Sequence, residues 1–360
     1  MKKIQVMLLV LVLLAVVPTG CRQRKYERFS GSFFDTFDTY TTFIGYTRNK
    51  EEFDRYFDMV QSRFRELHKL FDKYNNYEGI NNIKTINDNA GIQPVKVEKA
   101  IIDLILFSRE WYAETGRKTN IAMGPVLEIW KRYFDDASYD PVNTDIPSLK
   151  ELGAASMLVD LDRVIVDEED HTVYLPDKGM SLDVGAVAKG FATELVAREL
   201  KEAGFLSGII SPGGNIRTIG KPLDKTRQRW GIGIQDPDMP IINDAQNTLD
   251  TIFVGEASVV SSGDYQRYYM YEGRRIHHII DPDTLMPGEN FRAVTVVAED
   301  AATADFLSTT LFLLSLEEGM SLLEDLDGVE AIWVMPDRSV HFSEGLQDML
   351  KSQGASGVSD

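Results

Sequence analysis

The stretch Met180-Ser-Leu-Asp-Val-Gly-Ala-Val-Ala-Lys-Gly-Phe-Ala-Thr193 organises the expected fold. Apolar residues flank Asp183 in strand alternation, Gly185 permits a sharp turn, and apolar residues recur at helical spacing over 186–203. A helix that begins there presents unpaired N–H groups and a partial positive charge, to which Lys189 adds a full charge. The stretch therefore predicts a strand, a turn and a helix whose junction could hold a phosphate or a metal ion. Most such junctions are only structural, so the rest of the chain has to decide between the two.

Length and composition are those of an ordinary globular protein. The 360 residues are 43% hydrophobic and 26% charged, which leaves room for a substantial core in one large domain or two modest ones. The 38 basic and 56 acidic residues give a formal net charge of −18. This balance argues against a nucleic-acid backbone as a partner and agrees with a protein that attracts divalent cations.

The first twenty residues resemble a bacterial lipoprotein signal peptide. Two lysines precede an apolar run over 4–17 that is too short to cross a membrane comfortably, and the only cysteine, Cys21, follows Pro-Thr-Gly. We expect cleavage before Cys21, acylation of its sulfur by palmitate, and a lipid-anchored position on the extracytoplasmic side of the cell envelope. An uncleaved signal anchor is the alternative, and it would also export the body. Residues 21–32, polar and basic, predict a membrane-proximal tether.

The body mixes helical and strand patterns without strict alternation. An α+β domain over 33–343, with a mixed or antiparallel sheet core and flanking helices, fits this order better than a doubly wound fold. Neither Gly-x-Gly-x-x-Gly nor Gly-x-x-x-x-Gly-Lys-Ser/Thr is present, which argues against a Rossmann or P-loop site. The polar residues 344–360 predict a flexible tail. Expected helices cover 51–74, 98–115, 126–133, 186–203 and 301–318, and expected strands or hairpins cover 33–46, 164–175, 231–235, 267–281, 292–298 and 331–335.

The helix expected after Asp300 carries a polar pair on an apolar stripe. Asp305 and Thr309 share a face with Phe312 and Leu316. A carboxylate on a core face needs a partner because its desolvation is costly. Either a structural salt bridge or a hard cation such as Mg²⁺ would supply that partner, the cation completing its shell from carbonyls, water and phosphate.

Two adjacent histidines form the other candidate group. His277 and His278 lie in an expected strand that ends at the Asp281-Pro282 turn, so their side chains point to opposite faces. At most one of them can serve a given site. Two ordinary core or surface histidines are the alternative.

Five motifs occur in one fixed order along the chain. They are Asp183-x-Gly-Ala-x-Ala-Lys-Gly190, Gly213-Gly-Asn-Ile216, Ser262-Gly-Asp-Tyr265, His278-Ile-Ile-Asp-Pro282 and Ala304-Asp-x-x-Ser-Thr309. With these motifs in this order, the sequence resembles the FAD:protein FMN transferase (ApbE) family from about Phe34 to Met335. The resemblance also implies an α+β fold related to T-folds.

The resemblance implies Mg²⁺-dependent transfer of FMN from FAD to a Ser or Thr hydroxyl of an exported acceptor protein, with release of AMP. His278 would be the base. The resemblance assigns the Mg²⁺ ligands to the Ala186 carbonyl, Asp305 and Thr309, and the FAD contacts to Tyr74, Ile121, Ala122, Met123, Asp183, Lys189 and Ile279. Two rival functions stay open: Mg²⁺-dependent FAD hydrolysis to FMN and AMP, and a lipoprotein that binds FAD without chemistry.

The sequence departs from the family pattern at three places. Phe37 stands where the family usually has Met before Gly-Thr, here Asp38-Thr39, and Leu285 replaces a Gly. Asn81-Asn-Ile83 replaces the common Ser-Arg-Leu. These departures affect the flavin end and the shape of its loops more than the metal centre.

Overall fold

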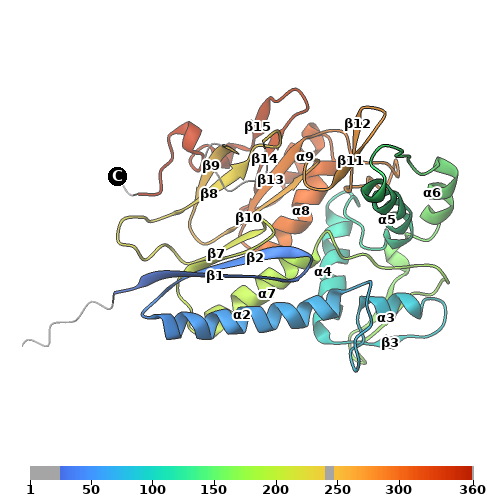
Figure 1. Ribbon diagram of the computed structural model, residues 1–360, viewed down its shortest axis with the longest axis horizontal. Helices are drawn as coiled ribbons and strands as arrows, with labels where there is room; N and C mark the ends of the chain where they lie inside the picture. The colour runs from blue at the N-terminus through green and yellow to red at the C-terminus, as the bar shows by residue number, and fades with distance from the viewer. Residues whose placement is uncertain (1–24, 240–246, 359–360) are drawn as a thin grey trace, which may run out of the picture.

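A single eight-stranded sheet runs through the middle of the computed structural model, which describes residues 25–239 and 247–358 (Figure 1). Every neighbouring pair of its strands is antiparallel, which confirms the expected α+β class with an antiparallel core. The expected signal peptide and Cys21 lie outside the described residues. In spatial order the strands are β1 (Glu27–Thr36), β2 (Thr39–Thr47), β6 (Gly208–Pro212), β7 (Ile216–Ile219), β10 (Ser258–Gly263), β13 (Ala293–Ala298), β14 (Glu330–Val334) and β15 (Val340–Phe342).

Three helices cover one face of this sheet (Figure 1). They are α2 (Lys50–Phe71), α7 (Ala188–Glu202) and α8 (Ala301–Leu313). The Asn49 side chain caps α2 by accepting from the Glu52 N–H, and an aromatic stripe on α2 faces the strands, as its spacing predicts. Helix α8 is buried almost all round, because it lies between the sheet and α7.

The opposite face is covered by a two-stranded ribbon and by the end of the chain. The ribbon is formed by β8 (Trp230–Gln235) and β9 (Thr248–Val254). Residues 344–358 were expected to be a flexible tail, and this expectation is wrong, because Leu346 and Leu350 are fully buried against the ribbon. Leu346 ends one short 3-10 turn and Leu350, four residues later, directly precedes a second one.

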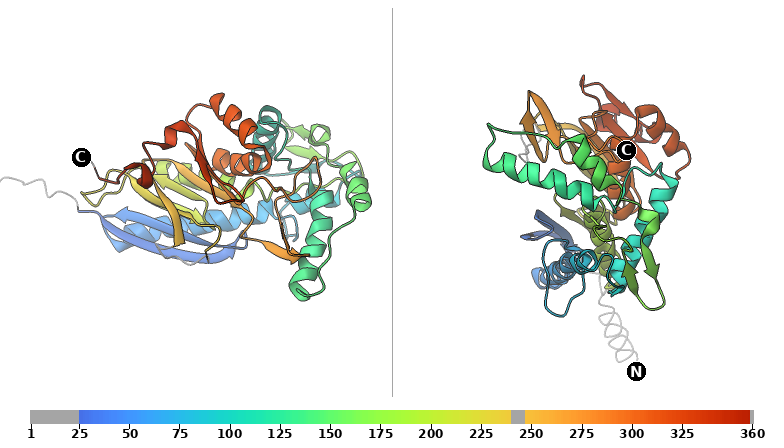
Figure 2. Two further views of the ribbon diagram at one scale, coloured as in Figure 1. Left: turned by 90° about the horizontal axis from the view of Figure 1, so that it is seen from above. Right: turned by 90° about the vertical axis from the view of Figure 1, so that its right-hand side faces the viewer.

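Most of the remaining elements lie toward the end of the molecule opposite the C-terminus, as Figure 2 shows for α5 and α6, whereas α9 lies nearer the middle, beside α8 and β14 (Figure 1). The hairpin β11–β12 packs against α5 in a separate apolar cluster, and its turn at Glu272-Gly273 confirms the expected hairpin. These elements are α3 (Ile83–Asp88), β3 (Val95–Lys96), α4 (Lys99–Glu114), α5 (Gly124–Tyr139), α6 (Leu149–Ser156), β4 (Ile165–Asp167), β5 (Thr172–Tyr174), β11 (Tyr268–Tyr271), β12 (Arg274–His277) and α9 (Leu316–Glu324).

The strand expected over 33–46 is wrong, because the chain turns back within it. Strands β1 and β2 form a hairpin whose two turn residues, Phe37 and Asp38, have φ values of 53° and 50°. Left-handed backbone is usually signalled by Gly or Asn, and neither occurs here. Strand β1 also begins at Glu27, so residues 27–32 belong to the sheet and not to a tether. Phe29 and Phe33 both pack on aromatic rings of α2.

The helix expected over 301–318 is two helices. Asp300 caps α8 as predicted, by accepting from the Thr303 N–H. Ser315 then starts α9 with a capping box, in which its side chain and that of Glu318 satisfy each other's backbone N–H groups. Leu316 therefore does not continue the face that carries Asp305.

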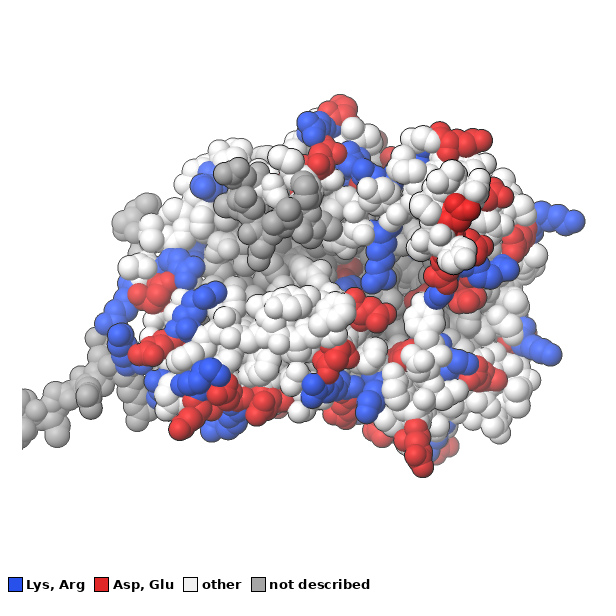
Figure 3. Space-filling view, viewed as in Figure 1, with Lys and Arg blue, Asp and Glu red and all other residues white. Residues whose placement is uncertain are grey.

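Charges of both signs are interspersed over the face shown in Figure 3, and a largely uncharged band crosses its middle. The acidic excess is thus not gathered in one place on this face. Within residues 25–239 and 247–358, no helix is both long enough and apolar enough to span a membrane.

Candidate active site

The residues before α7, around Asp183, are not part of a β-sheet. Their backbone forms hydrogen bonds with a side chain, where a strand would bond to a neighbouring strand. The Asn87 side chain accepts from the Leu182 N–H at 2.7 Å and donates to the Leu182 carbonyl at 2.9 Å. The Asp183 N–H donates to the Ile121 carbonyl at 2.7 Å. The strand expected around Asp183 is therefore wrong, although Leu182 and Val184 are both buried on either side of it, as the alternation predicts. An asparagine 95 residues away supplies the hydrogen bonds that a neighbouring strand would have given.

Helix α7 then begins close to its expected start and lies against α8 without a side chain between them. A Cβ atom at position 190 would overlap the Ala301 carbonyl oxygen and the Asp305 Cβ, so only glycine permits this approach. The Gly190 N–H donates to Asp305 Oδ2 at 2.8 Å. A carboxylate from α8 thus caps the positive end of α7. The helix ends as predicted before Gly204, whose φ is 88°.

Asp305 is 4% exposed and has two partners in α7. Besides the Gly190 N–H, the Lys189 Nζ lies 3.9 Å from Asp305 Oδ1. The structural salt bridge that the sequence left open is therefore present. Its length leaves room for a further partner at Oδ1, because a strong lysine–carboxylate contact is about 1 Å shorter.

Two further oxygens near Asp305 fit a hard cation. Because the Gly190 N–H is used by Asp305, the Ala186 carbonyl loses its normal helix partner and accepts no backbone hydrogen bond from the described part of the chain. Thr309 lies one helical turn from Asp305 and is half-buried. Ser308, in contrast, is occupied by Ser262 at 2.8 Å and by the Asp305 carbonyl at 2.9 Å.

These donors fit Mg²⁺ better than a metal held by several charged ligands. A carboxylate, a carbonyl and a hydroxyl are oxygen ligands, and Mg²⁺ is usually bound by one or two carboxylates with water and phosphate. Among the residues that the structure describes, no group of three or more His, Cys, Asp or Glu could hold a metal ion. Asp305, Thr309 and the Ala186 carbonyl would therefore need water or an anionic ligand to complete the shell.

Asp183 faces a second lysine on the other side of the helix start. Asp183 Oδ1 accepts from the Gly185 N–H at 3.0 Å, and Oδ2 pairs with Lys73. The Lys73 Nζ also lies 4.8 Å from the centre of the Tyr74 ring, which is half exposed. Burial lowers the pKa of Lys73, but the charge and hydrogen bond of Asp183, together with Tyr74, outweigh it, and the net pKa lies above the usual value. Lys73 is therefore a cation within the proposed FAD contacts.

The loop that carries Lys73 and Tyr74 is braced by Asp72. This carboxylate accepts from the Tyr74 N–H at 2.6 Å, from Asn75 and from the Tyr77 hydroxyl at 2.7 Å. Burial would raise the pKa of Asp72, but these hydrogen bonds lower it overall. Burial and the bond to Asp72 raise the pKa of Tyr77 to about 12. The sequence analysis did not identify Asp72, Lys73 or Asn87, although the first two directly precede Tyr74, a predicted FAD contact.

Residues 121–123 form a buried wall beside Asp183. Ile121, Ala122 and Met123 are all nearly inaccessible, backbone included, so this segment supports the site from behind more than it offers a surface to a ligand. The Ile121 carbonyl already holds Asp183, and a Cβ on Gly124 would overlap Ser181. The structure thus brings this predicted segment against the lead-in to α7.

The two histidines have different environments, which confirms that they point to opposite sides. His277 is buried, its Nε2–H donates to the Gly288 carbonyl at 2.6 Å, and its Nδ1 accepts from the Ile279 N–H at 3.3 Å. Burial lowers the pKa of His277. Both ring nitrogens are used, so this histidine is structural.

His278 follows the last residue of β12, which ends earlier than the expected strand, and its side chain is exposed. Only a donor can bond a carbonyl, so Nδ1–H donates to the Arg267 carbonyl at 3.3 Å and Nε2 keeps its lone pair. Desolvation by the surrounding protein atoms, then the positive charges of Arg267 and Lys189, lower the pKa of His278. Because the ring is still exposed, this desolvation is partial. His278 is a neutral imidazole near pH 7, within electrostatic reach of Lys189.

Ile279 is the predicted FAD contact that the structure favours least. Its N–H donates to His277, and its carbonyl accepts from the Gly288 N–H at 3.0 Å. Both main-chain groups are therefore used, and only the second lone pair of the carbonyl is left for a ligand.

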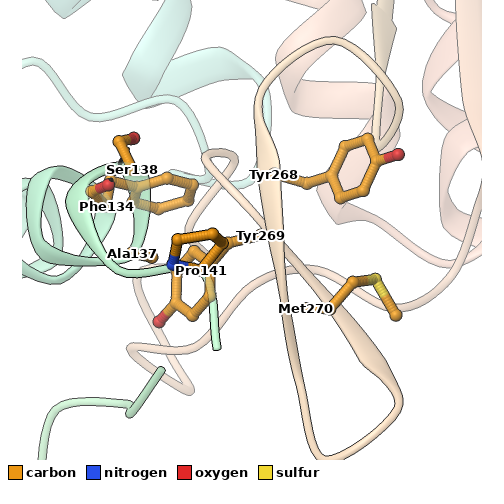
Figure 4. A pocket seen from close by; sticks show the side chains of 7 residues that line it. All are labelled: Phe134, Ala137, Ser138, Pro141, Tyr268, Tyr269 and Met270. Atoms are coloured by element: carbon orange, nitrogen blue, oxygen red, sulfur yellow. Dashed lines mark hydrogen bonds between the residues drawn. The ribbon is translucent and has the colours of Figure 1, made fainter. Parts of the chain in front are cut away.

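A cavity of about 320 Å³ lies outside these residues, between α5 and the β11–β12 hairpin (Figure 4). Tyr269 points toward Phe134 and Pro141, whereas Tyr268 and Met270 point to the other side of the strand (Figure 4). None of the predicted site residues lines this cavity. It does not belong to the candidate active site.

The arrangement gathers paired lysines and carboxylates at a helix start, and a neutral histidine lies within electrostatic reach of Lys189. This set of groups suits an enzyme that acts on a phosphorylated ligand. The chain belongs to the ApbE family, whose model matches residues 37–333. A Treponema pallidum protein named FAD:protein FMN transferase is 31% identical over 281 residues, which cover 75% of each chain. A Klebsiella pneumoniae protein of the same name is 32% identical over 262 residues, covering 72% of this chain and 77% of the relative.

Solved structures agree with this assignment. The ApbE protein from Thermotoga maritima superimposes with a TM-score of 0.76 at 25% identity, covering 89% of this chain and 98% of that chain. The flavin transferase ApbE from Vibrio cholerae gives a TM-score of 0.72 at 19% identity, with 90% and 99% covered. At that identity the second match supports the fold alone.

Proposed function

We propose that this enzyme transfers FMN from FAD to a Ser or Thr hydroxyl of a target protein and releases AMP. The family and the names of its relatives support flavin transfer. The observation that carries the proposal is His278, an exposed neutral imidazole whose Nδ1–H is fixed by a carbonyl, beside the Lys189–Asp305 pair. Such a histidine can accept the proton of an approaching hydroxyl.

The steps follow from these positions. His278 Nε2 takes the acceptor proton as the hydroxyl oxygen forms a bond to the FMN-side phosphorus of FAD. The bond from that phosphorus to the bridging oxygen breaks, and AMP leaves with the electron pair. Lys189 stabilises the charge on the phosphates. Mg²⁺ held by Asp305, Thr309 and the Ala186 carbonyl would neutralise further pyrophosphate charge.

We also propose that the enzyme acts outside the cytoplasm, anchored to a bacterial membrane by a lipid on Cys21. The support is the signal-like pattern of residues 1–20, with the only cysteine directly after it. An exported enzyme needs an exported acceptor, so the target protein belongs to the same compartment. Mass spectrometry of the membrane fraction, looking for a lipid on Cys21, tests this part separately.

The test of transfer is mass spectrometry of a candidate acceptor incubated with the enzyme, FAD and Mg²⁺. We expect the mass of FMN on a Ser or Thr, and no addition with Asp305→Ala. Asp103→Ala removes an exposed carboxylate that pairs with Lys99 on α4 and serves as the matched control. Transfer by Asp305→Ala at the wild-type rate would contradict the assignment.

Hydrolysis of FAD is the second candidate, because an exposed His278 also admits water. Free FMN and AMP, with no flavin on any acceptor, would identify this activity. FAD that stays intact with Mg²⁺ and acceptor would instead indicate a binding protein. The three outcomes are separated by one chromatogram and one mass spectrum.

A further inference from the structure

Lys73 lies at a point where two of the expected FAD contacts meet. Its Nζ pairs with Asp183 and lies 4.8 Å from the centre of the Tyr74 ring. The side chains of Lys73 and Asp183 are only 15% and 12% exposed. A ligand that touches both Asp183 and Tyr74 must therefore touch or displace this ammonium.

The surroundings hold Lys73 in place. Asp183 is fixed by the Gly185 N–H and by its own backbone bond to Ile121, and the Asp72 carboxylate braces the loop on the other side. An ammonium carries three N–H donors, of which Asp183 accepts one and Tyr74 attracts a second at most. At least one donor of a largely buried cation is thus left for a ligand, and an oxygen with negative charge is the partner that suits it best.

The positive charge around the Tyr74 ring also favours an anionic ligand at this place. A second lysine, Lys131, lies 5.7 Å from the ring centre, so two cations flank an aromatic ring that is half exposed. Each has one carboxylate partner, Asp183 for Lys73 and Asp135 for Lys131. FAD has groups that would suit these partners: an aromatic ring with carbonyl oxygens for Tyr74, and two phosphate charges for the lysines.

We propose that Lys73 is a further FAD-binding residue, whose ammonium stays on Asp183 and donates to an oxygen of FAD beside Tyr74. This rests on the proposed function, because it assumes that FAD is the substrate. Neither the five family motifs nor the expected contacts included Lys73. The ligand oxygen belongs either to a phosphate or to the flavin ring.

The experiment measures dissociation constants for FAD with Lys73→Gln, Lys73→Arg and Lys69→Gln in the full chain with Mg²⁺. Glutamine removes the charge and keeps an N–H donor on a side chain one bond shorter, and the melting temperature without ligand checks that the fold is retained. Lys69 is an exposed lysine four residues earlier, with its Nζ 5.7 Å from the Tyr77 ring, and is the matched control.

We expect Lys73→Gln to raise the FAD dissociation constant by about tenfold, the effect of losing one charged hydrogen bond. Lys73→Arg should stay within about threefold of wild type, since it keeps the charge, and Lys69→Gln should not change it. The KM for FAD should rise with dissociation, while kcat at saturating FAD changes by less than about twofold. Parallel titrations with AMP, FMN and riboflavin locate the oxygen: a loss for riboflavin indicates the ring, and a loss only for phosphate-bearing ligands indicates phosphate.

Equal or tighter FAD binding by Lys73→Gln would overturn the inference, because Lys73 would then only compete with FAD for Asp183. Failure of the wild-type protein to bind FAD at all would instead overturn the proposed function. The two failures are therefore distinct.

Discussion

The two sides of the α7 start are built differently. The metal wall is our name for the residues proposed to hold the metal, Ala186, Lys189, Asp305 and Thr309; it comes from α8, from α7 packed on it without a gap, and from the turn before α7. The flavin wall is our name for the residues proposed to contact FAD, Lys73, Tyr74, Asp183 and 121–123; it comes from loops held by side-chain hydrogen bonds. In one half of the site, the packing of two helices fixes the positions of the residues. In the other half, side-chain hydrogen bonds fix the positions of loops.

A methyl group at the helix contact should break the metal wall. Gly190→Ala forces α7 away from the Ala301 carbonyl and Asp305. We expect FMN transfer to fall by more than about a hundredfold, because small misplacements of a catalytic site are that costly. The free energy of unfolding should fall by about 1–3 kcal/mol.

The control for this change is Gly153→Ala in α6, where a new Cβ meets nothing within 4 Å. It should raise stability by about 0.5–1 kcal/mol through helix propensity and leave transfer unchanged. Thermal unfolding and the transfer rate measure both variants. Normal transfer by Gly190→Ala would show that the metal wall tolerates movement.

Loosening the flavin wall should have a smaller effect on turnover and a clear effect on FAD. Asp72→Asn removes the charge that collects the N–H and O–H donors of the Tyr74 loop. We expect the KM for FAD to rise about tenfold with kcat little changed, and a loss of about 1–3 kcal/mol of stability. The exposed Asp88→Asn, which breaks a surface pair with Lys84, should change neither.

The pH dependence of unfolding checks the same carboxylate. The pKa of Asp72 is lowered in the folded protein, so its stabilisation is present above the unfolded pKa of about 3.9 and is lost as the pH falls. Asp72→Asn should flatten that part of the acid limb. An unchanged acid limb would mean that Asp72 adds nothing to stability.

The pH–rate profile tests His278, the proposed base. The pKa of His278 is lowered, so the transfer rate should rise with pH below about 6.5 and be level above it. Arg267→Gln removes a positive charge near His278. The loss of this charge raises the pKa of His278 and should move the rising limb to higher pH by less than about one unit. Arg274→Gln, at the other end of the hairpin, should not move it. A limb centred above pH 6.5 in the wild type would contradict this assignment.

The smallest effect concerns the strained turn near the flavin wall. Asp38 has a φ of 50° where the family usually has Gly, so Asp38→Gly should raise the free energy of unfolding by about 0.5 kcal/mol. Transfer should not change. Glu272→Gly, at a φ of 48° in the β11–β12 turn, should give the same gain far from the flavin wall and is the control. A lower transfer rate with Asp38→Gly alone would show that the strain serves the site.

Most of the metal wall could be predicted from the sequence, because Lys189, Asp305 and Thr309 lie in helices whose spacing is regular. Asp305 and Thr309 are one turn apart, and Gly190 follows Lys189 at the start of α7. The bracing of the flavin wall could not be predicted. Asn87 reaches Leu182 across 95 residues and Lys73 reaches Asp183 across 110, and no local pattern encodes either contact.

The missed turns have a related cause. Phe37, Asp38 and Leu285 all adopt positive φ without being glycine or asparagine, so the usual signal is absent. Tertiary contacts stabilise them: the Phe37 ring packs on Phe64 and His68, and the Leu285 carbonyl accepts from the Trp130 indole. The departures from the family pattern at Phe37 and Leu285 thus fall at strained backbone.

The start of β1 at Glu27 limits how far the folded body can lie from Cys21. If Cys21 carries the lipid that we propose, six residue steps join the membrane anchor to the sheet, and a fully extended chain spans about 20 Å over that length. The folded body would then stay within about that distance of the bilayer surface. Acceptors whose hydroxyl lies close to the membrane surface would be within reach, and those that project far from it would not.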